Sequence, residues 1–229
     1  MAGPEDISGR QGVGSPDGLA PHARPQLKET EYDGISYVCP TWDQMGTYNF
    51  ALARQIIESG QSFDRIVALA RGGWTWARDL ADALKIPELS SVRIISYTGV
   101  NESREPKIVQ PLTDPIGGER VLLFDEVIDS GRTVIKAQKY LKEMGAEEIQ
   151  TAALCYKPRS IVRPDFFAFS TDAWVVFPHE IREFVETSAD KWRSAGVSMG
   201  EAKDRLITIG VPSDQAEFYM LLFGHRKQK

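Results

Sequence analysis

An apolar stretch in the middle of the chain leads into three acidic side chains. Residues 121–133 read VLLFDEVIDSGRT, so Asp125 and Glu126 directly follow the apolar run and Asp129 comes shortly after them. The small residues after Asp129 can form a turn whose backbone N–H groups, hydroxyl side chains and following helix N-terminus bind a phosphate. The adjacent carboxylates can accept hydrogen bonds from a diol such as ribose. Together these groups suit a sugar phosphate, whereas each acid on its own could equally be a helix cap or a solvated loop residue.

The whole stretch resembles the phosphoribosyl-pyrophosphate (PRPP) binding motif of type I phosphoribosyltransferases, an apolar strand followed by D/E-D/E-x-x-D/E-S/T-G-x-S/T. It is not a P-loop, because the pattern G-x-x-x-x-G-K-S/T is absent. The resemblance implies that PRPP is bound by Asp125, Glu126, Asp129, Ser130, Gly131, Arg132 and Thr133. It also implies that Asp129 lies near the imidazole nitrogen of a purine and acts as the catalytic general base, while the two leading acids hold the ribose hydroxyls.

An earlier segment resembles a second motif of the same family. Residues 66–73 read IVALARGG and are similar to the pyrophosphate loop, in which backbone N–H groups and an arginine hold the leaving group. The resemblance implies that Arg71 and Gly72 bind pyrophosphate. An Arg-Gly-Gly sequence after a strand could by itself also be only a tight turn.

A long polar stretch separates these two motifs. Ser96 and Tyr97 stand at its start and are similar to the flexible lid of the family, which closes over the reacting carbon. Residues 98–119 show no apolar periodicity, and a loop of about 20 residues is uncommon in a compact domain unless it covers a site. We therefore expect this stretch to be an active-site lid.

Two segments near the end of the predicted sheet resemble the purine hood of xanthine-guanine and hypoxanthine-guanine phosphoribosyltransferases. They read LCYKP (residues 154–158) and DAWVVFPHE (residues 172–180). The resemblance implies that Lys157, Trp174 and Val175 bind the purine. A lysine can donate to a 6-oxo group, an indole can stack on the ring, and the backbone at Val175 would meet the 2-position. Taken alone, such a tryptophan is more often a core residue and such a lysine a solvated one.

The resemblance implies a purine salvage enzyme that uses Mg²⁺. Its substrates would be PRPP and a 6-oxopurine base (hypoxanthine, guanine or xanthine), and its products a nucleoside 5′-monophosphate and pyrophosphate. The expected metal ligands are Asp125, Glu126 and Glu180, and which member of the acid pair approaches the metal stays open. The alternatives are a phosphoribosyltransferase for adenine or a pyrimidine, and a PRPP-sensing regulator with the same fold. We also expect a homo-oligomer, either a dimer or a tetramer.

These motifs need a sheet that brings them together. Apolar runs alternate with helical periodicity from Tyr32 onward, and strands are predicted at 35–39, 65–69, 92–97, 121–124 and 149–156. Near-continuous apolar strands separated by helices indicate an α/β, doubly wound, mainly parallel sheet. In such sheets the ligand lies beyond the carboxyl ends of the strands. The loops after the strands at 65–69, 121–124 and 149–156 would therefore meet at one edge of the sheet. A small hood would cover this edge.

The rest of the chain divides around this domain. We expect a disordered arm over residues 1–30, the phosphoribosyltransferase domain over 31–185, and a small C-terminal helical extension over 186–229. The 27 Lys and Arg against 32 Asp and Glu give a net charge of −5, which argues against a nucleic-acid binder. No apolar run is long enough to span a membrane, and the 2 cysteines suggest neither a disulfide framework nor a zinc site, so we expect a cytoplasmic protein.

Overall fold

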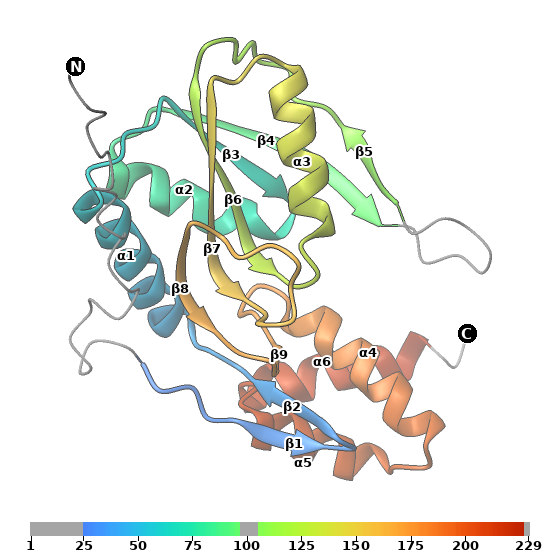
Figure 1. Cartoon of the computed structure of the whole chain (residues 1–229). Coiled ribbons are helices and arrows are strands. Elements are labelled where there is room, and N and C mark those ends of the chain that lie inside the picture. Colours follow the sequence, from blue (N-terminus) through green and yellow to red (C-terminus); the bar gives the residue numbers. More distant parts are fainter. Residues whose placement is uncertain (1–24, 97–104, 227–229) are drawn as a thin grey trace, which may run out of the picture.

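A six-stranded sheet forms the centre of the protein. The computed structural model describes residues 25–96 and 105–226, in which the strand order of this sheet is β5-β4-β3-β6-β7-β8 (Figure 1). The strands are β3 (Arg65–Ala70), β4 (Glu88–Ser96), β5 (Pro106–Gln110), β6 (Arg120–Ile128), β7 (Glu148–Tyr156) and β8 (Phe166–Ser170). Neighbouring strands are parallel except for β4 and β5. The prediction of an α/β fold with a mainly parallel sheet is confirmed.

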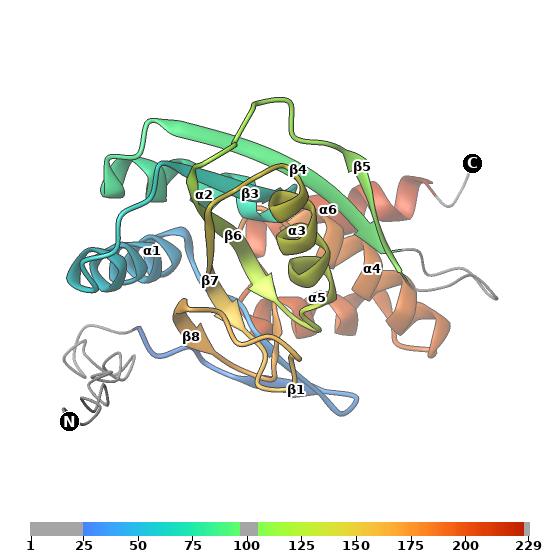
Figure 2. The ribbon, with the colours of Figure 1, turned by 45° about the horizontal axis from the view of Figure 1, so that its top comes forward.

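Helices cover both faces of this sheet (Figure 2). They are α1 (Trp42–Glu58) and α2 (Gly72–Leu84) on one face and α3 (Arg132–Glu143) on the other. Alternate side chains of a strand point to opposite faces, so Phe124 joins the core beneath α1 and α2 while Leu123 joins the core beneath α3. Helix α1 begins with a capping box, in which the Thr41 hydroxyl accepts from Gln44 N and the Gln44 side chain accepts from Thr41 N.

The structure corrects the sequence prediction of the strands. The predicted strand at 35–39 lies outside the central sheet, and β8 was not predicted. Strand β6 continues to Ile128, so the two leading acids lie within a strand and not in a turn after it. Residues 98–119 are not one continuous lid, because β5 pairs with β4 and the side chains of Leu112 and Ile116 are buried in the core beneath α3. A short edge strand that alternates half-buried and exposed side chains carries too little apolar signal to be recognised in sequence.

A second, smaller sheet forms the predicted hood. It consists of β1 (Thr30–Tyr32), β2 (Ile35–Val38) and β9 (Trp174–Val175), and its order is β1-β2-β9. Strands β2 and β9 are parallel, with Tyr37 opposite Trp174, so segments from the two ends of the domain lie side by side. The last residues of the predicted arm pack on the domain: Leu27 packs on the core, and Tyr48 Oη donates to the Pro25 carbonyl. Residues 1–24 of the predicted arm lie outside the described part.

The C-terminal helices share a core with the hood. They are α4 (Ile181–Ser194), α5 (Met199–Ile209) and α6 (Ser213–Arg226), and they lie at the hood end of the molecule (Figure 1). Tyr37 of β2 and Val176, just after β9, are buried in one cluster with Trp192 and Leu206. The predicted boundary between residues 185 and 186 falls inside α4, so the helices are not a separable appendage. Among the described residues, no helix is long and apolar enough to cross a membrane.

This shared core predicts that a change in the C-terminal helices destabilises the hood. Trp192 has 1% of its surface exposed, and its replacement by alanine should lower the free energy of unfolding by about 3–5 kcal/mol, the usual cost of removing a buried aromatic side chain. Urea unfolding followed by circular dichroism measures this difference.

Phe218→Ala is the matched control, because Phe218 lies on α6 with 57% of its surface exposed. It should change the free energy of unfolding by no more than about 0.5 kcal/mol, as surface substitutions usually do. Equal effects of the two substitutions would show that α4 does not support the hood.

Candidate active site

Two cavities lie where the carboxyl ends of the central strands meet the hood and α4. The first has a volume of about 460 Å³ and is lined by six of the predicted site residues: Glu126, Asp129, Lys157, Trp174, Val175 and Glu180. The second, of about 620 Å³, is lined by Arg71 and Gly72 together with His179, Glu180 and residues of α4. Glu180 lines both cavities, so they are neighbours. The topology therefore brings together most of the residues that the sequence motifs indicated.

Lys157 occupies a buried position between β7 and the hood. It directly follows β7, its backbone N–H donates to the Ile128 carbonyl at 2.9 Å, and its ammonium group donates to the Ala173 carbonyl just before β9. Burial lowers the pKa of the Lys157 ammonium group. The side chain is 95% hidden, yet it lines the first cavity, so its donors are held at the wall of the pocket and not spread into solvent.

Trp174 and Val175 sit on the hood strand β9 with opposite exposure. The indole of Trp174 lines the first cavity with 61% of the residue surface exposed, whereas Val175 is 7% exposed and belongs to the main core. Pairing of β9 with β2 holds both residues in register. The exposure of Trp174 favours a stacking surface over a core role. Its apolar sequence context alone left both roles open.

Asp129, the expected general base, is held by an arginine that sequence reasoning missed. The Arg159 guanidinium donates to Asp129 Oδ1 from two nitrogens, at 2.6 and 3.1 Å, and both side chains are exposed. Arg159 also lines the first cavity. Its position two residues after Lys157, at the end of β7, was the available signal. The ion pair fixes the direction of the Asp129 carboxylate at the mouth of the pocket.

The expected phosphate turn lies between β6 and α3. Gly131 precedes α3 with φ = 81°, a backbone conformation that favours glycine, and a Cβ atom there would lie 2.8 Å from Ser160 Oγ. Ser130 and Arg132 are exposed, and Ser130 Oγ accepts from Arg132 N at 3.4 Å. Thr133 is half-buried in the first turn of α3. These residues form a helix N-terminus that can accept a phosphate.

Glu126 is buried against the glycine of the predicted pyrophosphate loop. Only 4% of Glu126 is exposed, and a Cβ atom at Gly72 would lie 1.7 Å from its Oε1 atom. The peptide bond between Ala70 and Arg71 is cis. Arg71 itself is exposed, and its guanidinium lies 3.9 Å from the Glu183 carboxylate. The glycine therefore leaves the space that this acid occupies, a relation between β3 and β6 that neither motif reveals alone.

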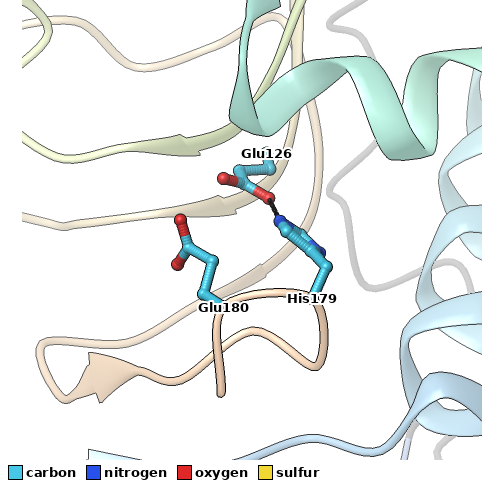
Figure 3. A group of neighbouring side chains, drawn as sticks. All are labelled: Glu126, His179 and Glu180. Carbon is cyan, nitrogen blue, oxygen red and sulfur yellow. Dashed lines mark ion pairs between the residues drawn. The ribbon is translucent and has the colours of Figure 1, made fainter. Parts of the chain in front are cut away.

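His179 lies beside Glu126 and Glu180, as Figure 3 shows. His179 Nε2 is 2.9 Å from Glu126 Oε2. Burial opposes the protonated imidazole, but the Glu126 carboxylate outweighs it, so the pKa of His179 is raised. Burial and the charge of Glu126 also raise the pKa of Glu180. The sequence analysis assigned no role to His179, since no spacing pattern links it to Glu126.

Asp125 does not join this group. Its Oδ1 atom accepts from the Glu126 backbone N–H at 2.9 Å, and burial, followed by the charge of Glu126, raises its pKa well above the usual value. Among the described residues, the possible metal ligands that lie within 4.8 Å of one another are Glu126, His179 and Glu180. The metal ligands expected from the resemblance were Asp125, Glu126 and Glu180, and of these Glu126 and Glu180 belong to this group. Of the predicted lid pair, Ser96 ends β4, and Tyr97 lies outside the described residues.

Comparisons with known proteins agree on one family. Residues 43–183 match the model of the phosphoribosyl transferase domain. The chain is 31% identical to the xanthine-guanine phosphoribosyltransferase of Gluconobacter oxydans, over 63% of this chain and 84% of that one. It is 34% identical to the hypoxanthine phosphoribosyltransferase of Salmonella typhimurium, over 45% of this chain and 60% of that one. A purine phosphoribosyltransferase from Pyrococcus horikoshii superposes with a TM-score of 0.57 and 34% identity, covering 62% and 92% of the two chains.

The contact between Gly72 and Glu126 generates a prediction. Gly72→Ala should leave the protein folded, because position 72 is helical and the atoms closest to the added Cβ atom belong to one side chain, that of Glu126. The melting temperature should fall, because this buried side chain must shift from its Cγ atom outward. The displaced carboxylate should lose its place in the site, so the affinity for PRPP should fall by about 10-fold, the loss of one charged hydrogen bond. Calorimetric titration measures the affinity.

Gly46→Ala on α1 is the control, because a Cβ atom there meets nothing within 4 Å. This variant should bind PRPP like the parent protein. Unchanged PRPP affinity in Gly72→Ala would show that the position of Glu126 is irrelevant to the ligand.

Proposed function

This chain belongs to the phosphoribosyltransferase family, and we propose that it transfers ribose 5-phosphate from PRPP to a 6-oxopurine in purine salvage. The base is hypoxanthine, guanine or xanthine. A bond forms between a purine imidazole nitrogen and the anomeric carbon, the bond from that carbon to pyrophosphate breaks, and the nitrogen loses its proton. The products are a nucleoside 5′-monophosphate and pyrophosphate.

The observation that carries this proposal is the composition of the 460 Å³ cavity, in which Asp129, Lys157 and Trp174 line one space. Its volume is within the usual range of about 300–1,000 Å³ for small-ligand sites. The three side chains offer an acceptor, a donor and an aromatic face, which are the groups needed to orient a 6-oxopurine. The names of the relatives, xanthine-guanine and hypoxanthine phosphoribosyltransferase, support the same class of base.

The proposed chemistry depends on orientation and charge, and no side chain forms a covalent intermediate. Trp174 stacks on the purine, and Lys157 donates to its 6-oxo group, so the imidazole nitrogen points toward Asp129, which accepts the proton. The departure of pyrophosphate leaves positive charge on the ribose ring, and the carboxylates at the end of β6 stabilise that charge. Arg71 binds the departing pyrophosphate after its weak ion pair with Glu183 opens.

We also propose that Mg²⁺ takes part, as a complex with PRPP. Glu126 and Glu180 fit this role, because Mg²⁺ prefers carboxylate and phosphate oxygens. Glu126 lines the first cavity, and Glu180 lines both. When bound, the ion would neutralise charge on the pyrophosphate group. A cytoplasmic location and a dimeric or tetrameric assembly remain predictions of the sequence.

Base preference tests the proposal most directly. The ammonium group of Lys157 has donors only, so it suits a 6-oxo group and opposes the 6-amino group of adenine. The kcat/KM for hypoxanthine or guanine should exceed that for adenine by about 10⁴-fold, the discrimination expected where a polar group would otherwise be left without a partner. Lys157→Met should shrink this ratio by about 10²-fold and keep the apolar stem. A spectrophotometric assay with hypoxanthine, guanine, xanthine, adenine and orotate measures kcat/KM for each base.

Lys142→Met serves as the control, because Lys142 is exposed at the end of α3. It should leave the ratio unchanged. A purified protein that prefers adenine or orotate would overturn the choice of base, and one that binds PRPP without turnover of any base would favour the regulator.

The pairing of Asp129 with Arg159 leads to a separate prediction. Asp129→Asn should lower kcat by about 10²-fold, the usual contribution of a general base, with little change in PRPP affinity. Arg159→Gln should raise KM for the purine more than it lowers kcat, because the general base Asp129 is present but its carboxylate is no longer held by an ion pair. Steady-state kinetics separate the two effects.

Asp204→Asn is a suitable control for the loss of one carboxylate, since Asp204 is exposed on α5. Its kinetic constants should match those of the parent. A near-normal kcat for Asp129→Asn would remove Asp129 from the role of base.

A further inference from the structure

Glu126, His179 and Glu180 direct their side chains toward one point (Figure 3). Their possible ligand atoms all lie within 4.8 Å of one another, and they come from β6 and from the segment between β9 and α4. We propose that these residues bind one divalent transition-metal ion, such as Zn²⁺ or Co²⁺, and that the protein holds this ion in the absence of PRPP. Glu126 and Glu180 are also the residues proposed to meet Mg²⁺ when PRPP is bound, so this proposal concerns the protein without PRPP and its test uses no substrate.

Burial of the donor atoms supports a bound cation. Glu126 Oε2 and both ring nitrogens of His179 are buried, and none of the three has a hydrogen-bond partner among the described residues. Glu126 as a whole is 96% hidden from solvent. A buried carboxylate oxygen without a hydrogen bond is costly, and Glu126 Oε2 meets His179 Nε2 at 2.9 Å. A metal ion would satisfy both carboxylates and the imidazole at once.

The donor types select the kind of metal. Mg²⁺ takes oxygen ligands and keeps several waters, whereas an imidazole together with carboxylates is typical of Zn²⁺ and related ions. His179 is therefore the residue that changes the preference of this group from a hard cation to a transition metal. Two carboxylates and a neutral imidazole also leave a negative charge that a divalent cation neutralises.

The geometry requires only a small adjustment. Ligand atoms at about 2.1 Å from a tetrahedral metal lie about 3.4 Å apart, so the present spread of up to 4.8 Å must close by about 1.4 Å. Glu180 can make this movement because it is half-buried and lines both cavities. Three protein ligands leave further positions for water, as in an open metal site.

The surroundings hold the group in place. The His179 ring stacks on Phe177, with centroids 5.7 Å apart, and lies 6.2 Å from the ring of Trp42. Gly72 leaves room for the Glu126 carboxylate, which a Cβ atom would displace. His179 and Glu180 line the 620 Å³ cavity, which gives an ion a route from solvent. Packing thus holds His179 and Glu126 in place, and the cavity leaves the group accessible to an ion.

Cobalt titration of the full chain, after removal of metals by a chelator, tests the proposal. Co²⁺ alone, without PRPP or base, should bind with a stoichiometry of one and produce visible d–d absorption. Excess Zn²⁺ should displace it, and Mg²⁺ at about 100-fold higher concentration should not. His179→Gln should weaken Co²⁺ binding by about 10-fold or more, since even residues outside the ligand shell change metal affinity by 10–100-fold. Glu180→Gln provides a second variant and should also weaken binding.

The chain contains 3 histidines, so His22→Gln and His225→Gln are matched controls and should bind Co²⁺ like the parent. Circular dichroism verifies that each variant is folded. Equal Co²⁺ affinity in His179→Gln and the parent, or displacement of Co²⁺ by Mg²⁺ at similar concentrations, would overturn the proposal. Because the readout uses no substrate, failure of the metal site and failure of the transferase function are distinguishable.

Discussion

The parallel pairing of β6 with β3 on one side and β7 on the other is the constraint on which the site depends. It aligns Ile66 with Leu122 and Leu122 with Gln150, so the three strands end at the same edge of the sheet. Parallel strands need crossover connections, and helices α2 and α3 start from the loops that follow β3 and β6 at that edge. Motifs separated by tens of residues therefore open into neighbouring cavities without any side chain having to reach across the molecule.

Burial of a carboxylate at this edge shapes the rest of the site. Glu126 is inside the strand and not in a solvated loop, so its charge must be met locally. Gly72 gives it space, His179 gives it a positive or metal-binding neighbour, and its charge raises the pKa of Glu180. The same buried acid thus connects the pyrophosphate loop, the hood and the start of α4. Substitutions in any two of these elements should therefore have non-additive effects.

The hood owes its position to the C-terminal helices. Three short strands bury little surface on their own. Tyr37 of β2 and Val176, just after β9, enter the cluster formed by α4, α5 and α6, and this stabilises the hood. The other side of the hood presents Trp174 to the pocket. The matched family domain spans residues 43–183, so most of these helices, and β1 and β2, lie outside it. The hood that lines the pocket is therefore held in place partly by residues outside the matched family domain.

The sequence alone determined the α/β class, the four inner strands β3, β4, β6 and β7, and the turn between β6 and α3. Buried strands and a glycine-containing turn leave local patterns that do not depend on distant contacts. Only the tertiary structure showed that Asp129 pairs with Arg159, that Trp174 is exposed, and that His179 lies beside Glu126 and Glu180. These relations join residues from different elements. Their side chains meet through strand pairing and burial, which no spacing along the chain encodes.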